Sequence, residues 1–248
     1  MTRQGGQVTL VEIRNRAEQG LTHPFYCKGD DHKWYWVKGN LAGKQALCCE
    51  WLAGRIGKAL GLPIPPFAQV MITENTIEYS AMEGIAELGS GWCFGSQHVE
   101  TADEFSVANI ASVDQNLRNM ILAFDWWIQN GDRILGPQGG NVNLLWTASD
   151  AKVHVIDHNV SFNNEFDIKA FKSDHVFSAD LLNLRSSFAL DIEGHMRDIV
   201  TRLQEFWEEL PEKWIEDATL SPGFSFDRVK AMLDRFQDTT PLFGGPTR

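Results

Sequence analysis

Four polar residues in the second half of the chain could together bind a divalent cation. Asp132 lies in a loop, Asn141 and Asn143 precede a short strand-like segment, and Asp157 ends the next such segment. A hairpin brings the residue before its first strand close to the residue after its second, so we expect these side chains to converge. Carboxylate and amide oxygens suit Mg²⁺, which completes its shell with water and phosphate oxygens. An acidic turn with asparagines at strand ends is the alternative for each residue alone, but their joint order favours the cation site.

The order of these residues resembles the loops of the protein-kinase-like fold. In that fold one Asp orients the acceptor hydroxyl, a later Asn holds a metal ion, and an Asp after the next strand holds metal on the phosphates. The resemblance is greatest to the HipA-like kinases. It rests on three motifs, which are Asn130-Gly131-Asp132-Arg133, Asn141-Val142-Asn143-Leu144-Leu145 and Ile156-Asp157-His158.

The spacing departs from the kinase pattern at one point. In kinases the metal-binding Asn follows the catalytic Asp by about five residues, whereas here Asn141 and Asn143 follow Asp132 by nine and eleven. If the additional residues ILGPQGG are an insertion, Asn141 is the ligand. If the ligand directly abuts the strand, it is Asn143. The sequence leaves both open.

The N-terminal half supplies three further candidates on the same resemblance. Lys38 ends the segment KWYWVK and matches the strand-borne Lys that contacts nucleotide phosphates. Glu50 lies on the following helix among apolar neighbours, where a carboxylate needs a partner, and it matches the Glu that pairs with that Lys. GLTHP at 20–24 occupies the place of the phosphate-covering loop, through Gly20 and backbone donors near Thr22. A solvent-facing Lys, an exposed helix Glu and a plain turn are the alternatives.

The resemblance implies a kinase that uses ATP and Mg²⁺ to phosphorylate a hydroxyl, which we expect on a protein Ser or Thr. Asp132 would position or deprotonate that hydroxyl. Asp157, with Asn141 or Asn143, would bind the metal. Two alternatives stay open, which are a nucleotide-binding pseudokinase or interaction module without turnover and a small-molecule or lipid kinase. HipA-like kinases also include toxins that act with a small DNA-binding antitoxin, so such a partner is a further expectation.

The elements that must position these residues change character along the chain. Apolar periodicity predicts strands over 8–14 and 33–38, a helix over 44–60, and a second helix over 113–128. Residues 15–32 are typical of turns, and 67–73 with 76–82 indicate a hairpin. Two short strands, 143–146 and 153–157, flank a turn, and helices are predicted over 178–187, 191–209 and 225–237.

This order predicts an α+β, two-lobed protein-kinase-like fold. The smaller β-rich N-lobe, with one helix and the nucleotide-phosphate contacts, is expected over residues 1–90. The mainly helical C-lobe, with the catalytic and metal-binding loops, is expected over 91–248. A chain of 248 residues is long enough to bury a substantial core in two such lobes.

Composition excludes several other classes of protein. Lys plus Arg number 22 against 33 Asp plus Glu, giving a formal net charge of -11, which disfavours direct nucleic-acid binding. No apolar run is long enough to span a membrane, and the polar first residues do not match a signal peptide. The four cysteines show no CxxC spacing and are expected as reduced thiols. We therefore expect a cytoplasmic protein without membrane contact, and any contact with DNA would come through a partner.

Overall fold

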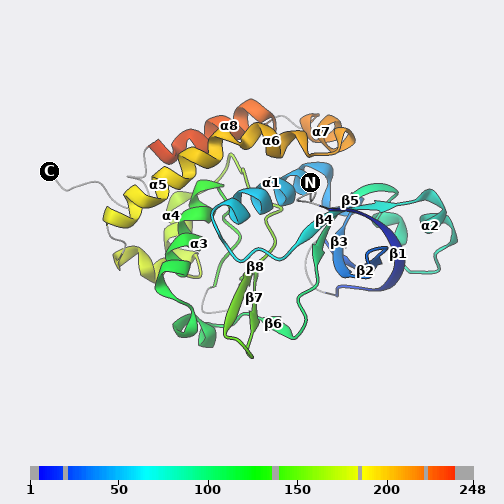
Figure 1. Ribbon diagram of the computed structural model, residues 1–248, viewed down its shortest axis with the longest axis horizontal. Coiled ribbons are helices and arrows are strands. Elements are labelled where there is room, and N and C mark those ends of the chain that lie inside the picture. Colours follow the sequence, from blue (N-terminus) through cyan, green and yellow to red (C-terminus); the bar gives the residue numbers. More distant parts are fainter. Residues whose placement is uncertain (1–5, 19–21, 136–139, 184–185, 221–222, 238–248) are drawn as a thin grey trace.

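Five strands from the N-terminal part form a closed barrel in the order β1-β2-β3-β5-β4 (Figure 1). The computed structural model describes residues 6–18, 22–135, 140–183, 186–220 and 223–237, which have a mixed α+β structure. The strands are Gly6–Arg16 (β1), Phe25–Gly29 (β2), Trp34–Lys38 (β3), Phe67–Ile72 (β4) and Gly91–Gln97 (β5). Neighbouring strands are antiparallel except β1 and β4, whose parallel pairing closes the barrel.

Alternation along β2 and β3 sorts their side chains between the barrel interior and its outside. Phe25 and Cys27 on β2 and Tyr35 and Val37 on β3 are buried in the barrel core. Successive strand residues point to opposite faces, so Lys38, at the end of β3, points away from that core. The alternation that buries the apolar residues of β3 in the barrel therefore also places Lys38 at the barrel edge.

Helix α1 (Lys44–Ala59) follows β3 and lies between the barrel and the helical part of the molecule (Figure 1). Its apolar residues, such as Leu47 and Trp51, belong to a second and larger hydrophobic core that also includes α3 (Gln115–Trp127). Glu50 lies on the same buried stretch of the helix. The amphipathic helix therefore carries one carboxylate into the region where the two parts meet.

The remaining elements are a small sheet and a set of helices. The sheet has the order β6-β7-β8, with β6 at Ala102–Glu104, β7 at Leu144–Thr147 and β8 at Lys152–Val155. The helices after α3 are α4 (Ile168–Asp174), α5 (Ser186–Thr201), α6 (Leu203–Glu208), α7 (Glu212–Thr219) and α8 (Phe226–Leu233). Asp114 precedes helix α3, and its carboxylate caps the helix by accepting from two backbone N–H groups.

The segment around α6 and α7 returns to the barrel and to α1. The indole of Trp214 donates to the carbonyl of Trp92 on β5 at 2.8 Å. The Gln69 amide on β4 donates to the carbonyl of Glu209 at 2.6 Å, and the carboxylate of Glu209 accepts from the Trp51 indole at 3.0 Å. These contacts give the barrel a defined place relative to the loops of the helical part.

Two local predictions are wrong. Residues 15–32 contain β2, a five-residue strand that the neighbouring turn residues concealed. Residues 76–82 do not pair with β4, because a short helix, α2 (Glu74–Tyr79), begins where the Thr73 hydroxyl accepts from the N–H of Thr76. The antiparallel partner of β4 is instead β5. The barrel thus extends past residue 90, where the sequence prediction ends the first lobe.

The strongest periodic segments are confirmed. Helices α1 and α3 lie within about a residue or two of the ranges predicted over 44–60 and 113–128. The hairpin predicted around residues 149–150 is formed by β7 and β8. Among the described residues, no helix combines the length and the apolar character needed to cross a membrane.

Candidate active site

Lys38, Glu50 and Asp157 form a buried cluster of charges where the barrel, α1 and the end of β8 meet. The Lys38 ammonium donates to a Glu50 carboxylate oxygen at 2.6 Å and to an Asp157 carboxylate oxygen at 2.7 Å. The other Glu50 oxygen accepts from the backbone N–H of His158 at 3.0 Å. Gly39 follows Lys38, and a Cβ atom there would overlap the carbonyl oxygen of Leu88. The close backbone approach beside Lys38 therefore requires glycine.

The pairing keeps both Lys38 and Glu50 charged despite their burial. Burial alone lowers the pKa of Lys38, but the adjacent carboxylates of Glu50 and Asp157 raise that pKa above its ordinary value. Burial alone raises the pKa of Glu50, but Lys38 and the side chain of His158 hold it well below its usual range. Asp157 is the most accessible member, with its side chain 27% exposed. The cluster is thus closed on the side of Glu50 and open on the side of Asp157.

Asp132 is held by the two asparagines that follow it. The Asn141 amide donates to the Asp132 carboxylate at 2.7 Å. The Asn143 amide donates to the same carboxylate oxygen and to the Asp132 carbonyl, both at 3.2 Å. Burial raises the pKa of Asp132 and the Asp157 charge adds to this, although the two amide donors oppose it. Each amide uses its nitrogen on Asp132, so each amide oxygen is available to another ligand.

The hairpin brings Asn143 beside Asp157, as the sequence predicted. The pairing of β7 with β8 continues one step beyond the strands, where the N–H of Ile156 donates to the carbonyl of Asn143 at 3.1 Å. Asn143 and Asp157 both have a positive φ, +51° and +56°, a conformation that Asn and Asp tolerate better than most residues. These two residues with positive φ lie just beyond the paired residues of β7 and β8, where the regular strand conformation ends.

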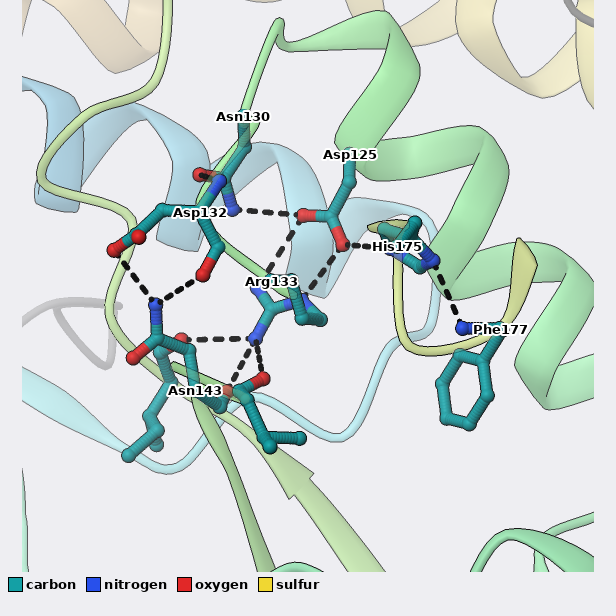
Figure 2. Close-up of polar contacts among 9 residues, drawn as sticks. Asp125, Asn130, Asp132, Arg133, Asn143, His175 and Phe177 are labelled. Atoms are coloured by element: carbon teal, nitrogen blue, oxygen red, sulfur yellow. Dashed lines mark hydrogen bonds and ion pairs between the residues drawn. The ribbon is translucent and has the colours of Figure 1, made fainter. Parts of the chain in front are cut away.

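Behind Asp132, a closed network surrounds the guanidinium of Arg133 (Figure 2). Arg133 and Asp125 are fully buried, and they form two hydrogen bonds of 2.6 and 3.3 Å. The Asp125 carboxylate also accepts from the Asn130 amide at 2.9 Å and contacts the His175 imidazole at 3.0 Å. Arg133 further donates to the carbonyls of Val142, Asn143 and Ile156. Arg133 therefore forms a buried structural salt bridge with Asp125.

A cavity of about 350 Å³ opens between the barrel and the β7–β8 hairpin. Lys38, Glu50 and Asp157 lie along it, and most of its remaining wall is apolar. That wall includes Trp36, Ile64, Pro65, Phe67, Phe94, Leu145, Val155 and Ile156. A concave, mainly apolar cavity of this size with a few convergent charges is typical of a small-molecule site.

A second cavity, of about 490 Å³, also has Asp157 in its lining. It is lined by Asp132 and Asn141, by Thr22 from the N-terminal part, and by residues of α4 and the segment before it. Asp157 lines both cavities. A group held at Asp157 could therefore reach from the first cavity towards Asp132 in the second.

The structure brings most of the predicted site residues together, although in two groups. Lys38, Glu50 and Asp157 share one cluster, and Asp132, Asn141 and Asn143 share the other. Thr22 lies at the second cavity, whereas Gly20 lies outside the described residues. Sequence reasoning missed Asp125 and His175. The Arg of the DR pair predicts a buried acidic partner somewhere, but it does not indicate which residue provides it.

The family model of the HipA-like kinases matches residues 10–241. This chain belongs to the HipA-like kinase family. Its structure is similar to the crystal structure of the Helicobacter pylori proinflammatory kinase CtkA, with a TM-score of 0.54, 11% identity, and 94% of each chain covered. The open conformation of CtTel1 also aligns, with a TM-score of 0.27, 14% identity, and coverage of 94% of this chain and 12% of the other. No curated protein sequence matches the chain. This HipA-like kinase is thus a phosphotransferase of the kinase type with a fold shared with CtkA.

Proposed function

We propose that this HipA-like kinase transfers the γ-phosphoryl group of ATP, with Mg²⁺, to a Ser or Thr hydroxyl of a protein. One observation carries the proposal: Asp157 lines two cavities, is paired with Lys38 at one, and shares the other with Asp132. In-line transfer needs such an order, with phosphates between a nucleotide pocket and an acceptor-positioning carboxylate. The barrel would serve as the N-lobe, ending after β5, and the helical part as the C-lobe.

The first cavity supports ATP as the donor. Its apolar wall suits a flat nucleobase, and Lys38 at its inner end offers a fixed positive charge to the phosphates. Glu50 orients Lys38 through the 2.6 Å bond. Lys38 would keep this orientation while its second bond moves from Asp157 to a phosphate oxygen, because Glu50 is itself anchored on the N–H of His158.

The donor atoms around Asp157 fit Mg²⁺. Asp157 supplies a carboxylate and Asn143 an amide oxygen, both hard ligands of the kind that Mg²⁺ prefers. Bound Mg²⁺ would neutralise phosphate charge. We favour Asn143 over Asn141 because the β7–β8 ladder fixes Asn143 next to Asp157.

Asp132 would position the acceptor hydroxyl and accept its proton. The amides of Asn141 and Asn143 orient its carboxylate, and burial with the nearby Asp157 raises its pKa, which brings it closer to that of a useful base. Most of the rate enhancement would come from positioning and from electrostatic stabilisation by Lys38 and the metal.

The second cavity favours a protein acceptor over an anionic lipid. Its described lining includes Glu165, Asp167 and Asp174 in addition to Asp132 and Asp157, and no Lys or Arg. A lipid phosphate head group would be repelled there, since like charges at close range oppose binding. A role as the toxin of a toxin–antitoxin pair, with a small DNA-binding antitoxin, remains a prediction from the family resemblance. A small helix-turn-helix gene next to this one would support it.

Incubation with γ-labelled ATP and Mg²⁺ tests the proposal. Wild type should label itself or a protein in a cell lysate, and Asp132→Asn should lower the rate by about 10²- to 10⁴-fold. Asp157→Asn should also abolish labelling. Binding of ATP without transfer by wild type would contradict the proposal and favour a nucleotide-binding module without turnover. Label only in a lipid or metabolite fraction would favour a kinase of small molecules.

Titration of Mg²⁺ separates the two asparagines. Asn143→Ala should raise the Mg²⁺ concentration needed for half-maximal labelling by about tenfold or more, since a metal ligand is lost. Asn141→Ala should lower the maximal rate and leave that concentration within about twofold, because its amide only orients Asp132. The reverse outcome would assign the metal to Asn141.

A further inference from the structure

We propose that His175 is a positioning residue for phosphoryl transfer, which acts on Asp132, Asn143 and Asp157 through Asp125 and Arg133. The inference rests on the proposed function. His175 belongs to none of the motifs in the sequence, and its nearest site partner, Asp125, lies 50 residues earlier. Figure 2 shows the chain of contacts that links the imidazole to Arg133 and from there to Asn143.

The Arg133 guanidinium joins three segments of the site. It follows Asp132 directly, and its Nη1 donates to the carbonyl of Asn143 and, at 3.2 Å, to that of Ile156. Ile156 directly precedes Asp157. One fully buried group therefore sets the backbone of the catalytic loop, of the asparagine before β7 and of the aspartate after β8 relative to one another.

The orientation of that guanidinium depends on the Asp125 carboxylate, which accepts from donors on both of its oxygens. Oδ1 accepts from the Asn130 amide and from Arg133 Nη2, and Oδ2 accepts from Arg133 Nε. His175 Nε2 lies 3.0 Å from the same Oδ2. Without the imidazole, one donor and the volume it occupies would be missing on this side. The carboxylate would then be free to turn away from Arg133.

The hydrogen bonds of His175 determine its proton. The N–H of Phe177 donates to Nδ1 at 3.1 Å, so Nδ1 carries no hydrogen and the proton of the neutral ring lies on Nε2, facing Asp125. Burial lowers the pKa of His175, which also favours the neutral ring. The network therefore contains one positive Arg133, one negative Asp125 and a neutral donor. If His175 were protonated, the network would hold two buried positive charges and only the one negative charge of Asp125.

His175 also connects the acceptor side of the site to the catalytic loop. It directly follows α4, whose Ala170, Phe171 and Asp174 line the second cavity. Residues 134 and 175 form a β-bridge, and the N–H of Val176 donates to the carbonyl of Arg133 at 3.0 Å. These backbone contacts place His175 between the Asp132 loop and the wall against which an acceptor would lie.

Two substitutions at position 175 test this role. Glutamine offers a neutral NH₂ donor and a carbonyl acceptor in place of the donor and acceptor nitrogens of the imidazole, whereas leucine fills much of the volume without either. His175→Leu should lower kcat by about 10- to 100-fold, because small displacements of reacting groups are costly. It should leave KM for ATP within about twofold, and His175→Gln should recover most of kcat. Val229→Ala, on the buried face of α8, is the control for lost stability and should keep the wild-type kcat.

Amide hydrogen exchange provides a readout that needs no activity. Exchange over 130–135 and 154–158 should be faster in His175→Leu and unchanged in His175→Gln and Val229→Ala. Unchanged kcat and exchange in His175→Leu would overturn the proposal, as would an equal loss of kcat in Val229→Ala. If wild type transfers no phosphate, the proposed function fails, and the exchange data alone then decide whether His175 positions these segments.

Discussion

Two networks of buried charge lie near the loop that contains Asp132, and they differ in balance and in access. Lys38, Glu50 and Asp157 carry one positive and two negative formal charges, and the Asp157 side chain is 27% exposed. Arg133 and Asp125 carry one charge of each sign, and both are 0% exposed. The first network thus has an uncompensated negative charge at a cavity, whereas the second is neutral and closed.

The difference indicates which network changes during a reaction cycle. The Asp157 carboxylate lines two cavities and is paired with a lysine that it shares with Glu50, so it can exchange that partner for a metal ion or a phosphate-bound cation. A carboxylate that accepts from Arg133, Asn130 and His175 has no such freedom. The open network is suited to binding and the closed one to holding the backbone, and the two should respond differently to substitution.

The largest expected effect is on the closed network. Arg133→Met should lower the free energy of unfolding by about 3–5 kcal/mol, because it leaves the Asp125 charge buried without its cation. Urea unfolding followed by circular dichroism measures this. The double variant Arg133→Met with Asp125→Leu should recover part of the loss, since no charge then remains unpaired. Arg118→Met, which breaks a bidentate but more exposed pair with Asp180, is the matched control and should cost less.

The open network should show the opposite balance of effects. Lys38→Met should lower phosphoryl transfer by about 10²- to 10³-fold, because the charge on the phosphates is lost. It should cost only about 1–3 kcal/mol of unfolding free energy, since Glu50 keeps the N–H of His158 and Asp157 can be hydrated. Labelling assays and urea unfolding on the same preparation check both. Equal losses of unfolding free energy for Lys38→Met and Arg133→Met would contradict the distinction between a network that binds and a network that holds the backbone.

The sequence was sufficient for the elements with strong periodicity and for the kinds of residue in the site. Helix α1 buries Leu47 and Trp51, so their spacing indicated it directly. The segment 76–82 misled because Ile77 and Tyr79 alternate as in a strand, yet neither is buried, and the Thr73 cap decides for a helix. Local alternation predicts a strand only where one face is covered.

The contacts between distant segments could not be predicted in the same way. The partners Lys38 and Asp157 lie 119 residues apart, and their convergence was expected only from the family resemblance. Neither Asp125 nor His175 belongs to a motif, because their roles arise from packing of α3 and the end of α4 around Arg133. A buried arginine needs partners, but only the fold determines which residues reach it.

The smallest expected effect is a pH dependence of the unfolding free energy that arises from His175 in the closed network. Burial lowers the pKa of His175, so the folded chain keeps this ring neutral while the unfolded chain takes up a proton below about pH 6.5. The unfolded state then binds more protons, and stability should fall with falling pH by at most about 1.4 kcal/mol per unit from this group. Asp125 and Glu50, whose pKa values are depressed, should add a separate loss only below about pH 4.

Comparison of wild type with His175→Gln isolates the contribution of the imidazole. Urea unfolding between pH 5 and 7 should give a flatter stability curve for His175→Gln, while His154→Gln, at a half-buried site on β8, corrects for a histidine outside the network. The wild-type and His175→Gln curves should converge at the acid end, because proton uptake by residue 175 in the unfolded chain lowers the stability of wild type alone. Parallel curves for wild type and His175→Gln would mean that the ring is protonated in the folded chain, and the closed network would then carry a positive charge instead of being neutral.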